Sequence, residues 1–317
     1  MKPDITVIMS VFREPEFWLQ QAIDSILSQT YTNFEFIIVL DDPENEEAKS
    51  VLESYAKKDQ RILLLINEKN RGLIFSLNRA LQYAKGHYIA RMDADDISHV
   101  DRLKKQKIYI EGQNLDLIGS NINLFREDGK VFATTDKLLY HNSIKKLLCI
   151  GTTNIAHPTF FVKKTVYDQL GGYGSAEHVE DKEFLAKAIC KGFKVGNMQE
   201  ALLDYRYNDQ SITKVQAWFV QENGKKITRH FCQCQKGISK IMLPIMPERG
   251  NRDTVLKNFQ LRQRAIAEIK QAYSEKVYIL VIKKLFMLLF LNPQEMIISL
   301  KIHSAYRWLR YKEKYFG

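Results

Sequence analysis

The stretch His87-Tyr88-Ile89-Ala90-Arg91-Met92-Asp93-Ala94-Asp95-Asp96 joins a short apolar run to three carboxylates. The run predicts a buried strand, and the acids stand where a strand commonly meets a turn residue such as Gly, Asn or Ser. Because one small residue separates Asp93 from Asp95, strand geometry would project both side chains the same way. Neighbouring carboxylates repel each other unless a cation lies between them or solvent screens them. The stretch therefore indicates either a site for a hard cation such as Mg²⁺ or Mn²⁺, or a solvated acidic loop.

Apolar strands alternate with amphipathic helices before this stretch. Continuous apolar runs over Ile5–Val11, Phe34–Leu40 and Arg61–Ile66 predict strands that are covered on both faces. Pro15 opens a helix whose apolar stripe follows helical spacing at Leu19, Ala22, Ile23, Ile26 and Leu27. A second helix follows the second strand, and a third begins at about Gly72. This alternation predicts right-handed crossovers and an α/β, Rossmann-like fold, with a mostly parallel sheet and flanking helices.

The predicted topology brings two acidic sites together. Asp41 ends the second strand and Asp93–Asp96 end the fourth, so both lie at the carboxyl edge of one sheet. Ligands of open α/β sheets bind at this edge. The shared position favours a binding site over a solvated acidic loop.

The sequence excludes several classes of ligand. The turn after the first strand, Phe12-Arg13-Glu14-Pro15, lacks the glycines that a dinucleotide site needs for close approach to a pyrophosphate, and no P-loop is present. A calcium-sensor loop starting at Asp93 would need Gly at its sixth position and Glu at its twelfth, where this chain has Ser98 and Lys104. Of the net charge of +10, +6 lies between Lys276 and Gly317, which argues against a general nucleic-acid surface.

The composition is that of a globular protein, with 45% hydrophobic and 26% charged residues among 317. Cysteines at positions 149, 190, 232 and 234 suit a reducing compartment, and Cys232-Gln233-Cys234 lacks a second pair at metal-ligand spacing, which favours ordinary helix residues. Met1-Lys2-Pro3-Asp4 leads directly into a strand without a signal peptide. No uncharged apolar run of about 18 residues predicts a membrane span. We therefore expect a cytoplasmic protein.

The chain from about Asp4 to Thr213 resembles the family 2 glycosyltransferases, which have the GT-A fold. The resemblance rests on ITVIMSVF in the first strand, AIDSILSQTYTNFEFIIVLDD after it, Asn70-Arg71-Gly72, the DxD-type cluster Asp93-Ala94-Asp95-Asp96, and Glu180-Asp181 before a helix. Each motif alone is weak, whereas their order and spacing together are specific. The resemblance implies a catalytic domain over residues 1–213, with a nucleotide-sugar half at about 1–97 and an acceptor half at about 98–213. A helical C-terminal region would follow over residues 214–317.

The resemblance implies a set of residues that contact the nucleotide-sugar donor: Ser10, Phe12, Glu14, Asp41, Arg71, Asp93 and Asp95. Ser10 and Phe12 would flank the base, and Asp41 would accept a hydrogen bond from the imide N–H of a uracil-type base. The family commonly has Pro at the place of Ser10, and Gly-Ser where this chain has Asp42-Pro43. The register at Asp41 is therefore open by one residue, and the strand count from Phe34 favours Asp41.

The remaining donor residues would meet the diphosphate side of the nucleotide sugar. Arg71 would lie near the base or the diphosphate, Asp93 would face the ribose, and Asp95 would bind the Mn²⁺ or Mg²⁺ that bridges the two phosphates. Departure of a nucleoside diphosphate develops negative charge on the leaving phosphate, and a divalent cation neutralises such charge.

Asp181 would be the base that deprotonates the acceptor hydroxyl. It stands in His178-Val179-Glu180-Asp181, ahead of a helix with Phe184, Leu185 and Ala188 on its inner face. The N-terminus of a helix favours an ionised carboxylate, which suits a proton acceptor at neutral pH. Attack from the face opposite the diphosphate gives inversion at the anomeric carbon. The alternative is that Asp181 only caps the helix.

His157, Glu180 and Arg206 are candidates for contacts with the acceptor or the diphosphate. His157 precedes Pro158 and is expected in extended geometry. Arg206 would follow the last strand of the domain, where it could pair with phosphate. A structural role is equally open for His157 and Arg206.

The C-terminal region combines apolar and basic segments. Val277–Leu291 is apolar but broken by Lys283-Lys284, and Asn292-Pro293-Gln294-Glu295 predicts a helix start. The last helix mixes aliphatic and aromatic residues with basic ones: Met296, Ile297, Ile298, Leu300, Lys301, Tyr306, Arg307, Trp308, Arg310, Lys312 and Lys314. This mixture favours a helix lying on an anionic membrane at the inner face of the plasma membrane. The alternatives are packing on the catalytic domain or on a second subunit of a homo-oligomer.

We therefore predict an inverting, metal-dependent glycosyltransferase that moves a sugar, with a UDP-sugar favoured as donor, to a saccharide or lipid-linked acceptor in polysaccharide biosynthesis. A sugar nucleotidyltransferase is the first alternative, but it would show a Gly-rich, Arg-containing loop after the first strand. A catalytically inactive, membrane-associated scaffold is the second, and the intact acids at positions 41, 93, 95 and 181 argue against it.

Overall fold

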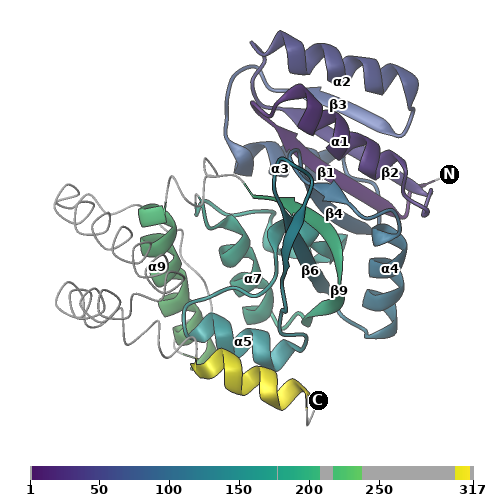
Figure 1. The fold of residues 1–317 in the computed structure, drawn as a ribbon. Coiled ribbons are helices and arrows are strands. Elements are labelled where there is room, and N and C mark those ends of the chain that lie inside the picture. Colours follow the sequence, from purple (N-terminus) through teal and green to yellow (C-terminus); the bar gives the residue numbers. More distant parts are fainter. Residues whose placement is uncertain (1, 177, 208–216, 238–303, 315–317) are drawn as a thin grey trace, which may run out of the picture.

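The computed structural model describes residues 2–176, 178–207, 217–237 and 304–314 (Figure 1). The predicted strands and helices of the first half are confirmed: β1 (Ile5–Val11), α1 (Glu16–Leu27), β2 (Phe34–Leu40), α2 (Glu46–Lys58), β3 (Ile62–Ile66), α3 (Leu73–Tyr83) and β4 (Tyr88–Asp93). Pro15 precedes α1 directly, and its carbonyl accepts from the backbone N–H groups of Trp18 and Leu19. Four of the five residues predicted for the stripe of α1 are buried, and Leu27 is partly exposed.

The second half begins with the strand–turn segment after the acids and ends in helices. Its elements are β5 (Ile97–Ser98), α4 (Arg102–Gly112), β6 (Leu117–Phe125), β7 (Val131–Thr134), α5 (His141–Cys149), the 3-10 helix η1 (His157–Thr159), β8 (Phe161–Lys163), α6 (Lys164–Leu170), α7 (Glu180–Cys190), β9 (Val195–Arg206) and α9 (Ala217–Gln235).

All the strands among the described residues belong to one mixed sheet, with the order β3-β2-β1-β4-β8-β6-β9-β5 and β7 paired to β6. The first-half strands β3, β2, β1 and β4 are parallel, as predicted. β8 runs antiparallel between β4 and β6, and it joins the strands of the second half to those of the first. The α/β fold with a mostly parallel central sheet is therefore confirmed, and the antiparallel strands lie in the second half.

Each face of the sheet has its own core. Consecutive residues of β1 point to opposite faces, so Ile8 packs with Leu77 and Ala80 of α3, while Val7 packs with Ile23 of α1. Helices cover the sheet on both sides, and its edge at the ends of β1, β2 and β4 is left to the loops (Figure 1). The register sets Asp93 beside Ser10 and Leu40 beside Val11, so Asp41 and Asp93 do lie at the same edge.

Helix α9 packs against α7 and α5. Cys232 and Cys234 were expected to be ordinary helix residues, and the four cysteines were expected to suit a reducing compartment. The structure instead joins Cys190 of α7 to Cys234 of α9 in a disulfide. The packing of α7 on α9 sets their Cα atoms 6.4 Å apart, which is within disulfide reach. Cys149 and Cys232 are free, and the Cys232 thiol lies against the Cys149 carbonyl oxygen.

Residues 304–314 form a helix beside α5, drawn in yellow in Figure 1. Leu309 is buried against Leu138 and Leu147, and the Glu313 carboxylate accepts from the backbone N–H groups of Leu139 and Tyr140. This segment therefore packs on α5 and the residues just before it, which agrees with the packing alternative that the sequence left open. The predicted segments Val277–Leu291 and Asn292–Glu295 lie outside the described residues. Among the described residues, no helix has the length and apolarity to cross a membrane.

Candidate active site

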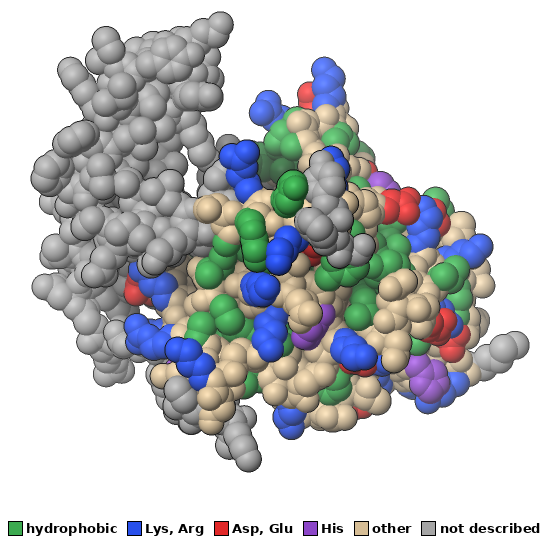
Figure 2. Space-filling model, turned by 90° about the horizontal axis from the view of Figure 1, so that it is seen from below, with side chains coloured by type: hydrophobic (Ala, Val, Ile, Leu, Met, Phe, Trp, Pro, Cys, Tyr) green, Lys and Arg blue, Asp and Glu red, His purple; other side chains and the backbone are tan. Residues whose placement is uncertain are grey.

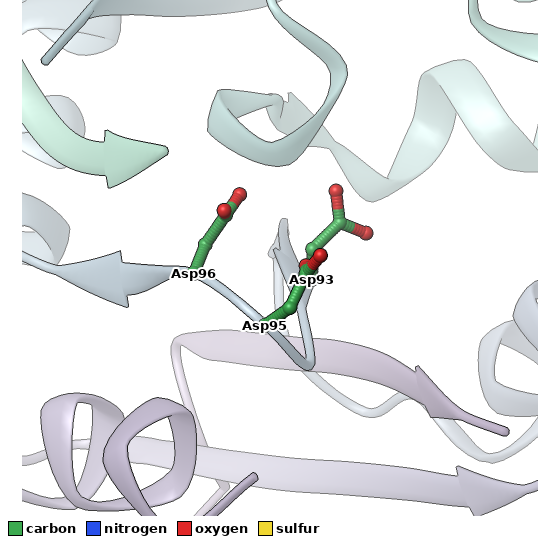
Figure 3. Close-up of side chains that lie close together, drawn as sticks. All are labelled: Asp93, Asp95 and Asp96. Carbon is green, nitrogen blue, oxygen red and sulfur yellow. The ribbon is translucent and has the colours of Figure 1, made fainter. Parts of the chain in front are cut away.

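Three carboxylates meet in the turn after β4 (Figure 3). Asp93, Asp95 and Asp96 each offer an oxygen, and these oxygens lie within 4.8 Å of one another. Strand geometry ends at Asp93, and a turn at Ala94 and Asp95 brings the three side chains to one side of the loop. Carboxylate oxygens are the ligands that Mg²⁺ and Mn²⁺ prefer, so the donor set fits a hard divalent cation.

Asp96, which had no role in the sequence analysis, is part of this group. Its side chain is fully buried, and its Oδ1 accepts from the backbone N–H of Arg206 at 2.9 Å. Its Oδ2 is buried and has no hydrogen-bond partner among the described residues. A buried carboxylate oxygen without a donor is costly, and a cation bound among the three acids would satisfy it.

Arg206 lies beneath the acidic turn. Its Nε donates to the backbone oxygen of Asp95 at 2.8 Å, and its Nη2 donates to Gln21 at 2.8 Å. The guanidinium lies between the rings of Trp18 and Phe125, at 4.7 and 4.5 Å. The structure thus gives Arg206 a role in fixing the turn, and a phosphate contact by its side chain stays a prediction.

The acids of the site repel one another. Burial raises the pKa of Asp95 to about 7, and the charges of Asp93 and Glu14 add to the effect. Burial also raises the pKa of Asp96, followed by the charges of Asp95 and Asp93. The Glu14 carboxylate folds back to accept from the backbone N–H of Phe12 at 2.8 Å, and burial raises its pKa as well. This concentration of negative charge favours binding of a cation.

Asp41 holds the loop that precedes α3. Its Oδ1 accepts from Asn67 and from the backbone N–H of Arg71, and its Oδ2 accepts from the backbone N–H of Gly72 at 2.8 Å. Gly72 has φ of 83°, a left-handed conformation that favours glycine. Asp42, which would take the place of Asp41 if the register were shifted by one residue, pairs with Arg13 at 2.9 Å. The Oδ2 of Asp41 has room to accept a further hydrogen bond. The predicted contact of Asp41 with a uracil-type base stays a prediction.

The cations and aromatic rings at this edge are more exposed. The Arg71 guanidinium lies 4.0 Å from the centre of the Phe75 ring, and the Arg13 guanidinium lies 4.9 Å from the Phe12 ring. Ser10 is partly exposed at the end of β1. These positions suit the predicted contacts of Ser10, Phe12 and Arg71 with a nucleotide, which stay predictions.

Asp181 lies in the first turn of α7, and Val179 rather than Asp181 is the N-cap. Asp181 accepts from the backbone N–H of Lys182 at 2.6 Å. The helix end was expected to favour ionisation, but the net shift is upward, because burial raises the pKa of Asp181. The Lys182 ammonium donates to the carbonyls of Gly151 and Gly224, so α9 is attached beside this carboxylate.

His157 and Glu180 lie next to each other. His157 Nδ1 lies 3.5 Å from Glu180 Oε1, and His157 Nε2 lies 2.8 Å from the Tyr173 hydroxyl. Burial and then the charge of Arg91 lower the pKa of His157 to about 3, so the ring is neutral at physiological pH. The expected extended geometry of His157 is wrong: it begins η1, where the Phe160 N–H donates to the His157 carbonyl.

Arg91 had no role in the predicted site, and neither had Lys137. Arg91 lies on β4 two residues before Asp93, and its guanidinium pairs with the Asp93 carboxylate. Its signal was a basic residue inside a buried strand, on the same face as Asp93. Lys137 follows β7, and burial lowers the pKa of its ammonium group, an effect that the charge of Asp181 opposes. No local sequence pattern marks Lys137.

Comparison with known proteins identifies the class of protein. Residues 6–171 match Glycosyl transferase family 2. The O-antigen biosynthesis glycosyltransferase WbnJ of Escherichia coli is 36% identical over 212 residues, which cover 66% of this chain and 82% of that protein. The UDP-Gal:alpha-D-GlcNAc-diphosphoundecaprenol beta-1,3-galactosyltransferase of Escherichia coli is 26% identical, over 66% of this chain and 76% of its own. The chain belongs to glycosyl transferase family 2 and is a glycosyltransferase.

The fold has a solved counterpart in S. aureus TarS residues 1–349 in complex with UDP-GlcNAc. The TM-score is 0.56 at 17% identity, and the match covers 97% of this chain and 92% of that one. The resemblance to family 2 and the GT-A fold are thus confirmed, and the sugar nucleotidyltransferase alternative falls.

Proposed function

We propose that this glycosyltransferase is inverting and metal-dependent and uses a UDP-sugar donor. The observation that supports the proposal most is the cluster of Asp93, Asp95 and Asp96 at the carboxyl edge of the sheet, next to Asp41. Arg91 of β4 pairs with Asp93, and His157 of η1, which lies next to β4, is 3.5 Å from Glu180, the neighbour of Asp181. Donor and acceptor groups would therefore meet between β4 and the start of α7.

The donor would bind along the ends of β1, β2 and β4. Asp95, with Asp93 and Asp96, would hold Mn²⁺ or Mg²⁺. When bound, such a cation neutralises the charge that develops on the leaving diphosphate. The relatives include an enzyme named for UDP-Gal and a fold counterpart bound to UDP-GlcNAc, which favours UDP over other nucleotides. Release of UDP, screened over a panel of nucleotide sugars with Mn²⁺, tests the proposal. Release from no UDP-sugar would contradict it.

Asp181 would take the proton of the acceptor hydroxyl as the new glycosidic bond forms. The bond between the anomeric carbon and the diphosphate breaks on the opposite face, which inverts the configuration of that carbon. The proton goes to the Asp181 carboxylate, and the electron pair of the broken bond leaves with UDP. Burial raises the pKa of Asp181 above its ordinary value and so brings it nearer to neutral pH. A carboxylate with such a pKa can accept the acceptor proton and later release it.

The raised pKa of Asp181 predicts the pH dependence of transfer. The base works only when ionised, so kcat/KM should rise with pH through a midpoint above the ordinary value for aspartate, about 3.9. His157, with its pKa of about 3, stays neutral across this range and adds no step. Rates measured from pH 4 to 9 check this. A rate that is constant down to pH 4, or an acidic limb that persists in Asp181→Asn, would contradict the role of Asp181.

The acceptor is proposed to be a saccharide, or a saccharide on a lipid diphosphate, in polysaccharide biosynthesis. The names of the two Escherichia coli relatives, one in O-antigen biosynthesis and one acting on a diphosphoundecaprenol saccharide, support this class of acceptor. A cytoplasmic location and self-association into a homo-oligomer stay predictions.

A lipid-linked acceptor requires access to a membrane, and the helix of residues 304–314 has a suitable face. Trp308 and Tyr311 are 51% and 56% exposed, and the Lys146 and Lys312 ammonium groups lie 5.6 and 4.3 Å from the Trp308 ring. Figure 2 shows Lys and Arg side chains interspersed with hydrophobic ones over the lower face of the molecule. Aromatic and basic side chains together suit the interface of an anionic bilayer.

Substitution of both exposed aromatics by Ala is expected to reduce binding to phosphatidylglycerol vesicles by about tenfold or more. Point substitutions are preferable to removal of Lys276–Gly317, because Leu309 packs against α5 and Glu313 accepts a hydrogen bond from the loop before it. Ile108→Ala, which removes an exposed apolar side chain from α4, is the matched control. Co-sedimentation measures the effect, and 1 M salt should weaken wild-type binding. No binding of the wild type to anionic vesicles would leave packing as the only role of this helix.

A further inference from the structure

Arg91 is buried beside the acidic turn, and part of its guanidinium makes no hydrogen bond. Its side chain is 4% exposed, and Nη2 pairs with Asp93 Oδ1. Nε and Nη1 are buried and have no hydrogen-bond partner among the described residues. Nε carries one N–H and Nη1 carries two, so most of the hydrogen-bonding capacity of this cation is left over.

A second buried arginine, on α4 next to the same strand, does not leave its donors unpaired. Arg102 is fully buried on α4, and its Nε donates to Gln106 at 2.9 Å. Its Nη1 lies against the Met92 sulfur, and its Nη2 donates to the Arg91 carbonyl. Buried polar groups are normally hydrogen-bonded in this way, because an unpaired buried donor costs free energy. The open donors of Arg91 therefore call for a partner that binds from outside.

The surroundings of Arg91 indicate what that partner is. Its guanidinium pairs with Asp93 in the acidic turn, and its backbone N–H donates to the carbonyl of Phe160, which ends η1, at 2.9 Å. His157 of η1 lies 3.5 Å from Glu180 Oε1 at the start of α7. Under the proposed function, the diphosphate lies at the acidic turn and the acceptor oxygen lies at Asp181. In-line displacement would set the transferred sugar between these two groups. Arg91 pairs with Asp93 in the acidic turn and lies on β4 next to η1, which contacts the start of α7.

We propose that Arg91 binds the transferred sugar: its Nε and Nη1 N–H groups donate to hydroxyl oxygens of the donor sugar, while its Nη2 holds Asp93 in place. This inference rests on the proposed function and adds a specificity residue to it. A sugar hydroxyl is the suitable acceptor because the metal held by the three acids would neutralise the diphosphate oxygens. Arg91 thus distinguishes a nucleotide sugar from the bare nucleotide.

The test compares UDP with UDP-sugars in wild type and in Arg91→Lys. Lys keeps the charge beside Asp93 but lacks the Nε and Nη1 donors. Affinity is measured by calorimetry with Mn²⁺ for UDP, UDP-GlcNAc and UDP-Gal, and the better of the two sugars is used. We expect Arg91→Lys to bind that UDP-sugar about 10- to 100-fold more weakly, the loss of hydrogen bonds from a charged donor. Affinity for UDP should stay within about twofold, because UDP lacks the sugar.

Arg102→Lys is the matched control. It changes an equally buried arginine next to the same strand, but one whose nitrogens are engaged within the protein. Its melting temperature should fall, and its affinities for UDP and the UDP-sugar should change by the same factor. Should Arg91→Lys fail to fold, Arg91→Met, which also removes the Nε and Nη1 donors, is compared through the ratio of its loss for the UDP-sugar to its loss for UDP.

Equal losses for UDP and UDP-sugar in the Arg91 variant, or no loss for either, would overturn the role of Arg91. The wild type separates this from failure of the proposed function. If the wild type binds no UDP with Mn²⁺, the proposed function itself is wrong. If wild-type binding is intact and the variant shows no selective loss, only the assignment of Arg91 is wrong.

Discussion

Asp181→Asn is expected to lower kcat for transfer by about 10²- to 10⁴-fold, the usual contribution of a general base. The amide has almost the same size but cannot take the acceptor proton. Donor affinity should change little, because Asp181 lies at α7, whereas the acids that would hold the metal lie after β4. Sugar transfer to acceptor, and calorimetry with UDP and Mn²⁺, measure the two effects on one preparation.

The matched control for this substitution is Asp168→Asn. Asp168 is an acid on the neighbouring helix α6, and its side chain is 56% exposed. The control should transfer sugar at the wild-type rate. Near wild-type transfer by Asp181→Asn would require another base, and Glu180, whose carboxylate is also buried at the start of α7, is the next candidate. Loss of UDP binding in Asp181→Asn would instead show that Asp181 has a role in donor binding or folding.

Much of the fold could be predicted because parallel strands covered by helices leave a strong local pattern. The apolar runs over β1 and β2 have the same bounds in sequence and in structure. β8 could not be predicted in this way, because it is three residues long and runs antiparallel between β4 and β6. Its place depends on partners more than 40 residues away on either strand, which no local period reveals.

The site was predictable in its acids and less so in the groups that support them. Asp93, Asp95 and Asp181 stand in recognisable short motifs. The partner of Asp96 is the backbone of Arg206, 110 residues later, so its buried role has no local signature. Arg91 was visible in the same stretch as the acids, but its unused N–H groups depend on what packs around it. Burial likewise reversed the shift expected for the pKa of Asp181 at a helix end.

Asp95→Ala is expected to remove metal-dependent binding of UDP. The carboxylate would be lost from a set of three, and a cation that bridges protein and diphosphate contributes several kcal/mol, so affinity with Mn²⁺ should fall by at least about 100-fold. Chelation of metal by EDTA should give the wild type the same low affinity. Calorimetry with UDP, with and without Mn²⁺, measures both effects. The matched control is Asp128→Ala, an acid in the turn between β6 and β7 that is 54% exposed.

The melting temperature of Asp95→Ala shows whether Asp95 is a metal ligand or an acid that stabilises the fold. Burial and the charges of Asp93 and Glu14 raise the pKa of Asp95 to about 7, so above that pH its ionised form destabilises the metal-free fold. Removal of the carboxylate should therefore leave the melting temperature at pH 8 without metal equal to the wild-type value or higher. The stabilisation that Mn²⁺ with UDP gives the wild type should disappear in the variant. Unchanged UDP affinity, or a lower melting temperature without metal, would exclude Asp95 as the metal ligand.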